Sequence, residues 1–137
     1  YYLMKMFRSK QEYDLIASGM EDRFVQYFLE RYNEDIKKFF PTFNGGMQSD
    51  TAYMVCCNGI PASILLGKKD ENDFFEIELD YSTPAYRDCS VGKYLYPALR
   101  EKGIRFLTTS EVQTATHSDY LTKMGFENQN DVYVKKL

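Results

Sequence analysis

Three apolar segments separated by two tight polar turns constrain the fold of this chain more than any other feature of its sequence. The segments are residues 51–57, 62–66 and 74–81. Asn58 and Gly59 separate the first two segments and are typical of a two-residue hairpin turn, because both residues tolerate a positive φ. A charged turn separates the last two segments. The pattern predicts an antiparallel meander of three strands.

The third segment alternates strictly between apolar and acidic residues. The apolar positions are Phe75, Ile77, Leu79 and Tyr81, and the acidic positions are Glu76, Glu78 and Asp80. Side chains along a strand point alternately to opposite faces, so the pattern predicts one buried face and one face with three carboxylates. The acidic face is either a solvent-exposed strand surface or the source of a general base.

The first fifty residues are expected to contain a strand, a short helix, a long helix and a loop. These elements are residues 1–7, 9–17, 21–40 and 42–50. Ser9 and Glu12 form a capping box, which predicts the start of the short helix. Apolar residues recur at the helical period through the long helix, which ends at Pro41.

The segments after the meander predict a parallel connection. In order they are a loop, a helix, a strand, a second helix and a last strand, at residues 82–88, 91–102, 104–109, 117–124 and 132–137. A strand, a crossover helix and a second strand form a right-handed βαβ unit, so the strands at 74–81 and 104–109 are expected to be parallel. The predicted fold is an α+β fold with a mixed, mostly antiparallel sheet and flanking helices.

The composition indicates one domain and excludes several classes of protein. A length of 137 residues suits a single domain over residues 1–137. A net charge of −3 without a basic stripe argues against nucleic-acid binding. No apolar run is long enough to span a membrane, and no signal peptide is visible. The three cysteines include the adjacent pair Cys56 and Cys57, which favours a reducing cytoplasm, and the single histidine, His117, predicts no metal site.

The sequence PAYRDCSVGK, residues 84–93, connects the third strand to the next helix. The first amides of a helix are unpaired and lie at the positive end of its dipole, so they bind phosphate readily. Ser90 can cap this helix, and Gly92 allows a ligand to approach the backbone closely. The segment predicts either a phosphate-binding loop or an ordinary capped helix start.

This segment resembles the acetyl-CoA-binding loop of the GNAT superfamily of N-acetyltransferases. Arg87 and Gly92 match the first and last positions of the family's Arg/Gln-x-x-Gly-x-Gly/Ala motif, and Ser90 replaces its first glycine. The later sequence YLTKMGF, residues 120–126, is similar to the family's aromatic helix with a K-x-G-F ending. The order of the predicted elements also resembles that of the family across almost the whole chain.

The resemblance implies a GNAT fold with a splayed parallel strand pair and acetyl-CoA as co-substrate. The implied cofactor-binding residues lie at the end of the third strand and in the following loop. They are Leu79, Tyr81, Ser82, Arg87, Asp88, Cys89, Ser90, Val91, Gly92 and Lys93. Backbone groups would hold the pyrophosphate and the pantetheine arm, whereas the Asp88 charge opposes pyrophosphate binding unless it points to solvent.

The resemblance also implies an acetyl transfer to an amine with a carboxylate base. Glu76 lies where several members place a glutamate base, and Glu78 is the alternative through water. The family's tyrosine proton donor corresponds to Leu121, so Tyr120, one position earlier, does not simply inherit the role. His117, one helical turn before, is a further candidate proton carrier.

The expected partner is a small-molecule or peptide amine, with no nucleic acid, and a homodimer is an option. One alternative function is a non-catalytic acyl-CoA-binding or regulatory module, and another is a structural or docking domain. The chain also resembles acetyltransferase-like domains at the C-terminal end of some bacterial membrane proteins. The expected location is therefore the cytoplasm, with a membrane tether through a region preceding Tyr1 as an option.

Overall fold

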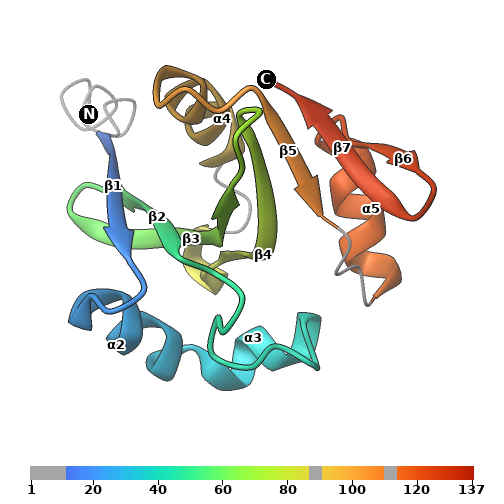
Figure 1. The fold of residues 1–137 in the computed structure, drawn as a ribbon. Helices are drawn as coiled ribbons and strands as arrows, with labels where there is room; N and C mark the ends of the chain where they lie inside the picture. Colours follow the sequence, from blue (N-terminus) through green and yellow to red (C-terminus); the bar gives the residue numbers. More distant parts are fainter. Residues whose placement is uncertain (1–11, 87–90, 110–113) are drawn as a thin grey trace, which may run out of the picture.

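The structure, a computed structural model, describes residues 12–86, 91–109 and 114–137. A seven-stranded sheet with the strand order β1-β2-β3-β4-β5-β7-β6 runs through it (Figure 1). The strands are β1 (Tyr13–Gly19), β2 (Thr51–Cys57), β3 (Ile60–Lys69), β4 (Phe74–Ser82), β5 (Phe106–Thr109), β6 (Glu127–Gln129) and β7 (Val132–Lys136). All neighbouring strands are antiparallel except β4 and β5, which are parallel. The predicted α+β class is confirmed.

The predicted meander is confirmed as β2, β3 and β4. Asn58 and Gly59 both have positive φ, at 51° and 81°, as a tight hairpin turn requires. The next turn is held by Asp70, whose carboxylate accepts hydrogen bonds from the amides of Asn72 at 2.8 Å and Phe74 at 3.0 Å. Local turn chemistry therefore defines both ends of β3.

Strand β1 replaces the helix expected over residues 9–17, and that expectation is wrong for the described part. Seven residue pairs join β1 to β2 in antiparallel register. The backbone amide of Asn58 donates to the backbone carbonyl of Glu12 at 2.8 Å, which fixes the start of the strand against the β2–β3 turn. Tertiary pairing outweighs the local capping signal here. The strand expected at residues 1–7 lies outside the described residues.

The long helix expected over residues 21–40 is two helices, α2 (Arg23–Arg31) and α3 (Asn33–Phe39). Asp22 caps α2, because its carboxylate accepts from the amide of Phe24 at 2.8 Å. The helical geometry breaks at Tyr32, which has φ −103° and ψ 14°. Its ring packs on Phe28, with 4.9 Å between ring centroids. The break occurs at an aromatic contact that the helical period alone does not reveal.

Two helices follow the meander, α4 (Val91–Glu101) and α5 (Ala115–Lys123), and the short 3₁₀ helix η1 (Pro84–Tyr86) precedes α4. The β4–α4–β5 segment forms the predicted parallel crossover. Strand β6, which the sequence pattern does not predict, pairs with β7 as a hairpin at the edge of the sheet. No helix within the described residues is long and apolar enough to cross a membrane.

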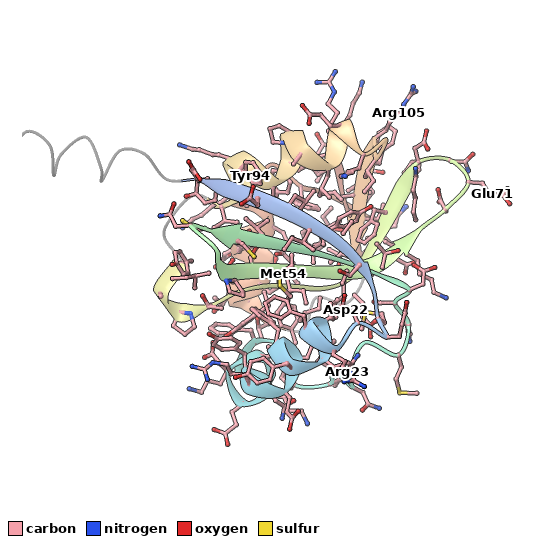
Figure 2. All side chains as sticks on the ribbon, turned by 90° about the vertical axis from the view of Figure 1, so that its left-hand side faces the viewer. Asp22, Arg23, Met54, Glu71, Tyr94 and Arg105 are labelled. Carbon is pink, nitrogen blue, oxygen red and sulfur yellow. The ribbon has the colours of Figure 1, made fainter. Side chains whose placement is uncertain are left out.

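The sheet separates two hydrophobic cores. The first, the α4–α5 core, includes Val55, Leu65, Phe75, Leu95, Leu99, Leu107 and Leu121. The second, the α2–α3 core, includes Val25, Phe28, Ile36, Met54, Ile64, Leu79 and Tyr81. Figure 2 shows Met54 on the side of the sheet that carries α2, and Tyr94 of α4 on the other side. The candidate site residues are therefore divided between the two faces of the sheet, since Val91 packs into the first core and Leu79 and Tyr81 pack into the second.

Candidate functional site

Strand β4 contains a β-bulge near its midpoint. Gly67 of β3 lies opposite Ile77, but the residue before it, Leu66, lies opposite Leu79. Glu78 therefore has no counterpart on β3. Such an extra residue bends the strand and redirects its side chains, and bulges are frequent next to active sites.

Gly67 permits this bulge because it has no side chain. A Cβ atom at Gly67 would overlap the carbonyl oxygen of Glu76 and would lie 2.7 Å from the Phe75 ring. The first of these atoms belongs to the backbone and cannot rotate away. Close approach of β3 to β4 therefore requires glycine at this position.

The bulge exchanges the two faces of β4. Before it, Phe75 and Ile77 pack into the α4–α5 core. After it, Leu79 and Tyr81 pack into the α2–α3 core instead. Strict alternation would place all four side chains on one face, so the single extra residue accounts for the exchange.

The expectation that Glu76, Glu78 and Asp80 share one face is therefore wrong. Glu76 and Glu78 line pockets on the α2–α3 side of the sheet. Asp80 lies on the opposite side, where its charge acts on Tyr96 of α4 and Tyr120 of α5. The sheet divides the acidic residues into a pair on one side and a single carboxyl group on the other.

The parallel strands β4 and β5 separate beyond the bulge. They pair at three positions, the last joining Glu76 to Thr108. Strand β4 continues to Ser82, whereas β5 ends at Thr109 within the described residues (Figure 1). This arrangement agrees with the splayed pair that the resemblance implies.

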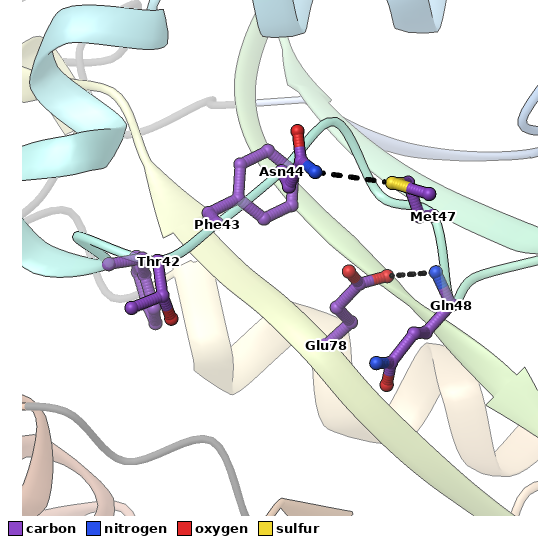
Figure 3. A pocket seen from close by; sticks show the side chains of 7 residues that line it. Thr42, Phe43, Asn44, Met47, Gln48 and Glu78 are labelled. Carbon is purple, nitrogen blue, oxygen red and sulfur yellow. Dashed lines mark hydrogen bonds between the residues drawn. The ribbon is translucent and has the colours of Figure 1, made fainter.

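Two adjoining pockets lie on the α2–α3 side of β4, with volumes of about 310 Å³ and about 380 Å³. They share Met47, Gln48 and Glu78. The first also has an apolar wall formed by Phe40 and Phe43, of which Phe43 is labelled in Figure 3. Met47 is 78% exposed at the rim. Together the pockets form a partly apolar groove beside the bulge.

The two glutamates of this groove have different surroundings. The Glu78 carboxylate accepts a hydrogen bond from the Ser49 hydroxyl at 2.5 Å. It also accepts one from the backbone amide of Gln48 at 3.2 Å (Figure 3). These bonds fix the loop before β2 to the bulge. Glu76 is exposed and lines the second pocket together with Lys68, which lies opposite it on β3. Glu76 is thus the more accessible carboxylate.

A second cluster of titratable side chains lies on the other side of the sheet and consists of Asp80, Tyr96 and Tyr120. Burial raises the pKa of Asp80 to about 6. Burial and the Asp80 charge raise the pKa of Tyr96, and the Asp80 charge and burial raise that of Tyr120. The neighbouring Tyr120 hydroxyl acts in the opposite direction and lowers the pKa of Tyr96. The buried Tyr96 hydroxyl has no hydrogen-bond partner within the described residues.

This environment predicts a pH dependence that Asp80→Asn should remove. A folded-state pKa of about 6, above the ordinary 3.8, means that folding favours the protonated acid. The Asp80 contribution to stability is therefore lost as pH rises from about 4 to about 6. Between pH 4.5 and 7.5 the unfolding free energy of the wild type should fall by about 2 kcal/mol relative to Asp80→Asn, measured by urea denaturation. Parallel pH profiles would contradict this prediction.

His117 lies in the first turn of α5, whose cap, Thr114, accepts its amide at 3.1 Å. The side chain is only 7% exposed, and neither ring nitrogen has a hydrogen-bond partner within the described residues. Burial lowers its pKa, so the ring is neutral near pH 7. Its ring packs edge-on against Phe40, with 4.8 Å between centroids. This contact joins α5 to the wall of the groove.

The implied cofactor-binding residues lie in several environments. Leu79 and Tyr81 have buried side chains, and the Tyr81 hydroxyl donates to Asp35 at 2.5 Å. Only their backbones remain candidates for ligand contact. Val91 is buried at the start of α4, where Gly92 and the exposed Lys93 follow it. Ser82 is half-buried opposite Ser63. Arg87, Asp88, Cys89 and Ser90 lie outside the described residues.

Sequence reasoning misses several features of the site. It does not bring Asp80 together with Tyr96, because strict alternation hides the bulge and Tyr96 follows an ordinary helical pattern. Gln48 and Ser49 come from a loop without a recognisable motif. Gly67 is the one available signal, since an isolated glycine in a strand suggests a bulge or a close backbone approach. Within the described residues, no group of three or more His, Cys, Asp or Glu side chains is placed to hold a metal ion.

The strand order, the parallel β4–α4–β5 crossover and the bulge where β4 and β5 separate define a GNAT fold. An acetyltransferase from Thermus thermophilus is similar to this chain with a TM-score of 0.66 and 14% identity, covering 91% of this chain and 97% of that chain. The PaiA N-acetyltransferase from Thermoplasma acidophilum, in complex with coenzyme A, gives 0.62 and 14%, covering 92% and 99%. A GNAT-family acetyltransferase from Staphylococcus aureus Mu50 gives 0.56 and 12%, also covering 92% and 99%.

These similarities establish the fold that the resemblance implied. No protein-family model and no curated protein sequence matches the chain. At 12–14% identity the shared property is the architecture, so the chemistry must be argued from the residues of this chain.

Proposed function

We propose that this protein is an acetyl-CoA-dependent N-acetyltransferase that moves an acetyl group directly to an amine. The observation that carries the proposal is the separation of β4 from β5 beside a bulge, with a groove lined by Glu76 and Glu78 on the same strand. The separation supports a donor position and the groove an acceptor position. Both positions adjoin the same few residues of β4, as direct transfer requires.

The described residues fit coenzyme A. The described pairing of β5 with β4 ends at Glu76, and backbone groups of β4 beyond that pair, such as those of Leu79, would be the ones to hold an extended ligand. Helix α4 starts at Val91, directly after the segment that resembles the phosphate-binding loop. Acetyl-CoA supplies an activated thioester when bound. The protein itself would hold the donor, orient the amine and accept its proton.

Glu76 is the proposed base of this reaction. It is exposed to the groove, whereas Glu78 already accepts two hydrogen bonds and acts better as a positioning residue or through a water molecule. A carboxylate that removes the proton of an ammonium group leaves the nitrogen lone pair free to attack the thioester carbonyl. Thiolate then leaves and acquires a proton, for which Tyr120 and His117 are the proposed donors.

A non-catalytic acyl-CoA-binding or regulatory module is the second candidate. The observation that favours it is the fully buried Leu121 at the position where the resemblance implies a tyrosine. Such a module would keep the coenzyme site and lose the transfer of the acetyl group. The acceptor in the first candidate is a small-molecule or peptide amine.

Isothermal titration calorimetry with acetyl-CoA tests both candidates together. We expect binding with a dissociation constant in the micromolar range, and acetylation of at least one member of a panel of polyamines, amino acids and peptides. No binding at millimolar acetyl-CoA would overturn both candidates. Binding without any acetylation across the panel would favour the regulatory module.

A further inference from the structure

The groove beside the bulge is apolar at one end and charged at the other. Phe40, Phe43 and Met47 line the pocket of about 310 Å³. Glu76 and Lys68 line the adjoining pocket of about 380 Å³. Sites for small molecules combine apolar walls with a few placed polar groups, and both volumes lie near the lower end of their usual range. The groove therefore suits a small ligand that is polar at one end only.

The apolar wall of the groove is held in place by the fold. The backbone amide of Phe43 donates to the carbonyl of Phe40 at 3.0 Å, so a turn after α3 brings both residues to the same wall. Both side chains belong to the α2–α3 core, and the Phe40 ring also packs edge-on against His117. A wall that is already ordered costs little conformational entropy when a ligand binds.

Met47 supplies the exposed apolar surface of the groove. Its side chain is 78% exposed and lines both pockets. Its sulfur accepts a hydrogen bond from the side-chain amide of Asn44 at 3.2 Å (Figure 3). A flexible thioether adapts to the shape of an apolar ligand, and covering such a ligand removes the Met47 side chain from water. A hydrocarbon group would be enclosed between Met47 and the aromatic wall.

The charges of the groove favour a ligand with one ammonium group. Among the described residues that line the two pockets, Glu76 and Glu78 are negative and Lys68 is positive. Glu78 already accepts hydrogen bonds from Gln48 and Ser49, whereas Glu76 is exposed to the groove. A carboxylate beside the ligand amine would meet the charge of Glu78. A second ammonium group would enter the apolar end, where its desolvation is costly.

We propose that the acceptor is a small primary monoamine with one hydrocarbon substituent. Its ammonium group lies at Glu76, and its substituent lies between Met47 and the wall formed by Phe40 and Phe43. The inference rests on the proposed function, since Glu76 is the proposed base of that reaction. It names the class of acceptor and makes Met47 a specificity-determining residue. Polyamines and free amino acids are poor acceptors for the same reasons.

Matched pairs of amines test this preference at saturating acetyl-CoA. Phenethylamine should show a kcat/KM at least about 10-fold above that of ethylamine, because its ring buries additional apolar surface. Hexylamine should exceed cadaverine, in which an ammonium group replaces the terminal methyl group, and phenethylamine should exceed phenylalanine, which adds only a carboxylate. Calorimetry of the same amines with protein saturated by coenzyme A should give the same ranking without turnover.

Met47→Ser tests the position of the substituent. The preference for phenethylamine over ethylamine should fall by about 3- to 10-fold, because part of the apolar contact is lost. The fold should persist, since Met47 is 78% exposed. Ile60→Ser is the matched control, because Ile60 is 55% exposed at the end of β3 opposite to Lys68, and it should leave the preference unchanged.

The outcomes distinguish this inference from the proposed function. Acetylation of cadaverine or phenylalanine at least as efficient as that of the monoamines would overturn the acceptor class and leave the proposed function intact. An unchanged preference in Met47→Ser would overturn the position of the substituent. Binding of acetyl-CoA without acetylation of any amine would overturn the acceptor class and favour the regulatory module. Failure of the wild type to bind acetyl-CoA would overturn the proposed function and this inference with it.

Discussion

Replacement of Gly67 by alanine should destabilise the protein by about 2–3 kcal/mol or more. The new Cβ atom would overlap the Glu76 carbonyl oxygen, far inside any real contact distance. Relief requires a shift of β3 or β4 at the bulge, because a backbone atom cannot rotate away. Urea denaturation followed by circular dichroism should therefore show a lower midpoint with an unchanged slope.

Gly19→Ala is the matched control for this substitution. Gly19 also lies in a strand, and a Cβ atom there would overlap the Glu21 carboxylate. That carboxylate ends a flexible side chain and can move, so the expected loss is below about 1 kcal/mol. Equal losses for the two alanine variants would contradict the argument that the bulge depends on Gly67.

Glu76→Gln should reduce the rate of acetyl transfer by about 10²- to 10⁴-fold, the usual contribution of a general base. The amide keeps the size of the side chain but cannot accept the ammonium proton. Since the coenzyme side is untouched, the dissociation constant of acetyl-CoA should stay within about twofold of the wild type. Steady-state kinetics and calorimetry on the same preparation measure the two effects.

Two further carboxylate variants show whether the loss is specific to Glu76. Glu78→Gln should raise KM more than it lowers kcat, because the Glu78 carboxylate holds Gln48 and Ser49 at the groove. Glu71→Gln, in the exposed turn between β3 and β4, should leave both parameters unchanged. A Glu76→Gln enzyme that retains a third of the wild-type rate would rule out Glu76 as the base.

Much of the fold follows from local sequence signals. The apolar run at residues 51–57 and the Asn58-Gly59 turn predict β2 with its observed bounds. Gly103 and Gly125 follow the two late helices with positive φ, as expected of residues that end helices. Where the prediction fails, at β1, the capping signal competes with pairing to β2, and such tertiary pairing is not visible in a short window of sequence.

The candidate site is less predictable, because its geometry depends on one extra residue in β4. The sequence of β4 alternates strictly between apolar and acidic residues, so it predicts that Asp80 and Glu76 lie on the same face of the strand. The register with β3 decides otherwise, and that register depends on Gly67 in another strand. The groove is equally hard to predict from local sequence, since Met47 and Gln48 come from a loop whose position depends on the whole fold.

The two separate cores have a consequence for how proteins of this shape diversify. The apolar wall of the acceptor groove, formed by Phe40 and Phe43, packs with the α2–α3 core, and helix α4, which begins at the proposed phosphate site, packs with the α4–α5 core. Distant substitutions without shared partners act almost independently on stability. Substitutions in the α2–α3 core beside the acceptor groove can therefore accumulate with little effect on the stability of the α4–α5 core. The Phe40–His117 contact is a point at which a change on one side should be felt on the other.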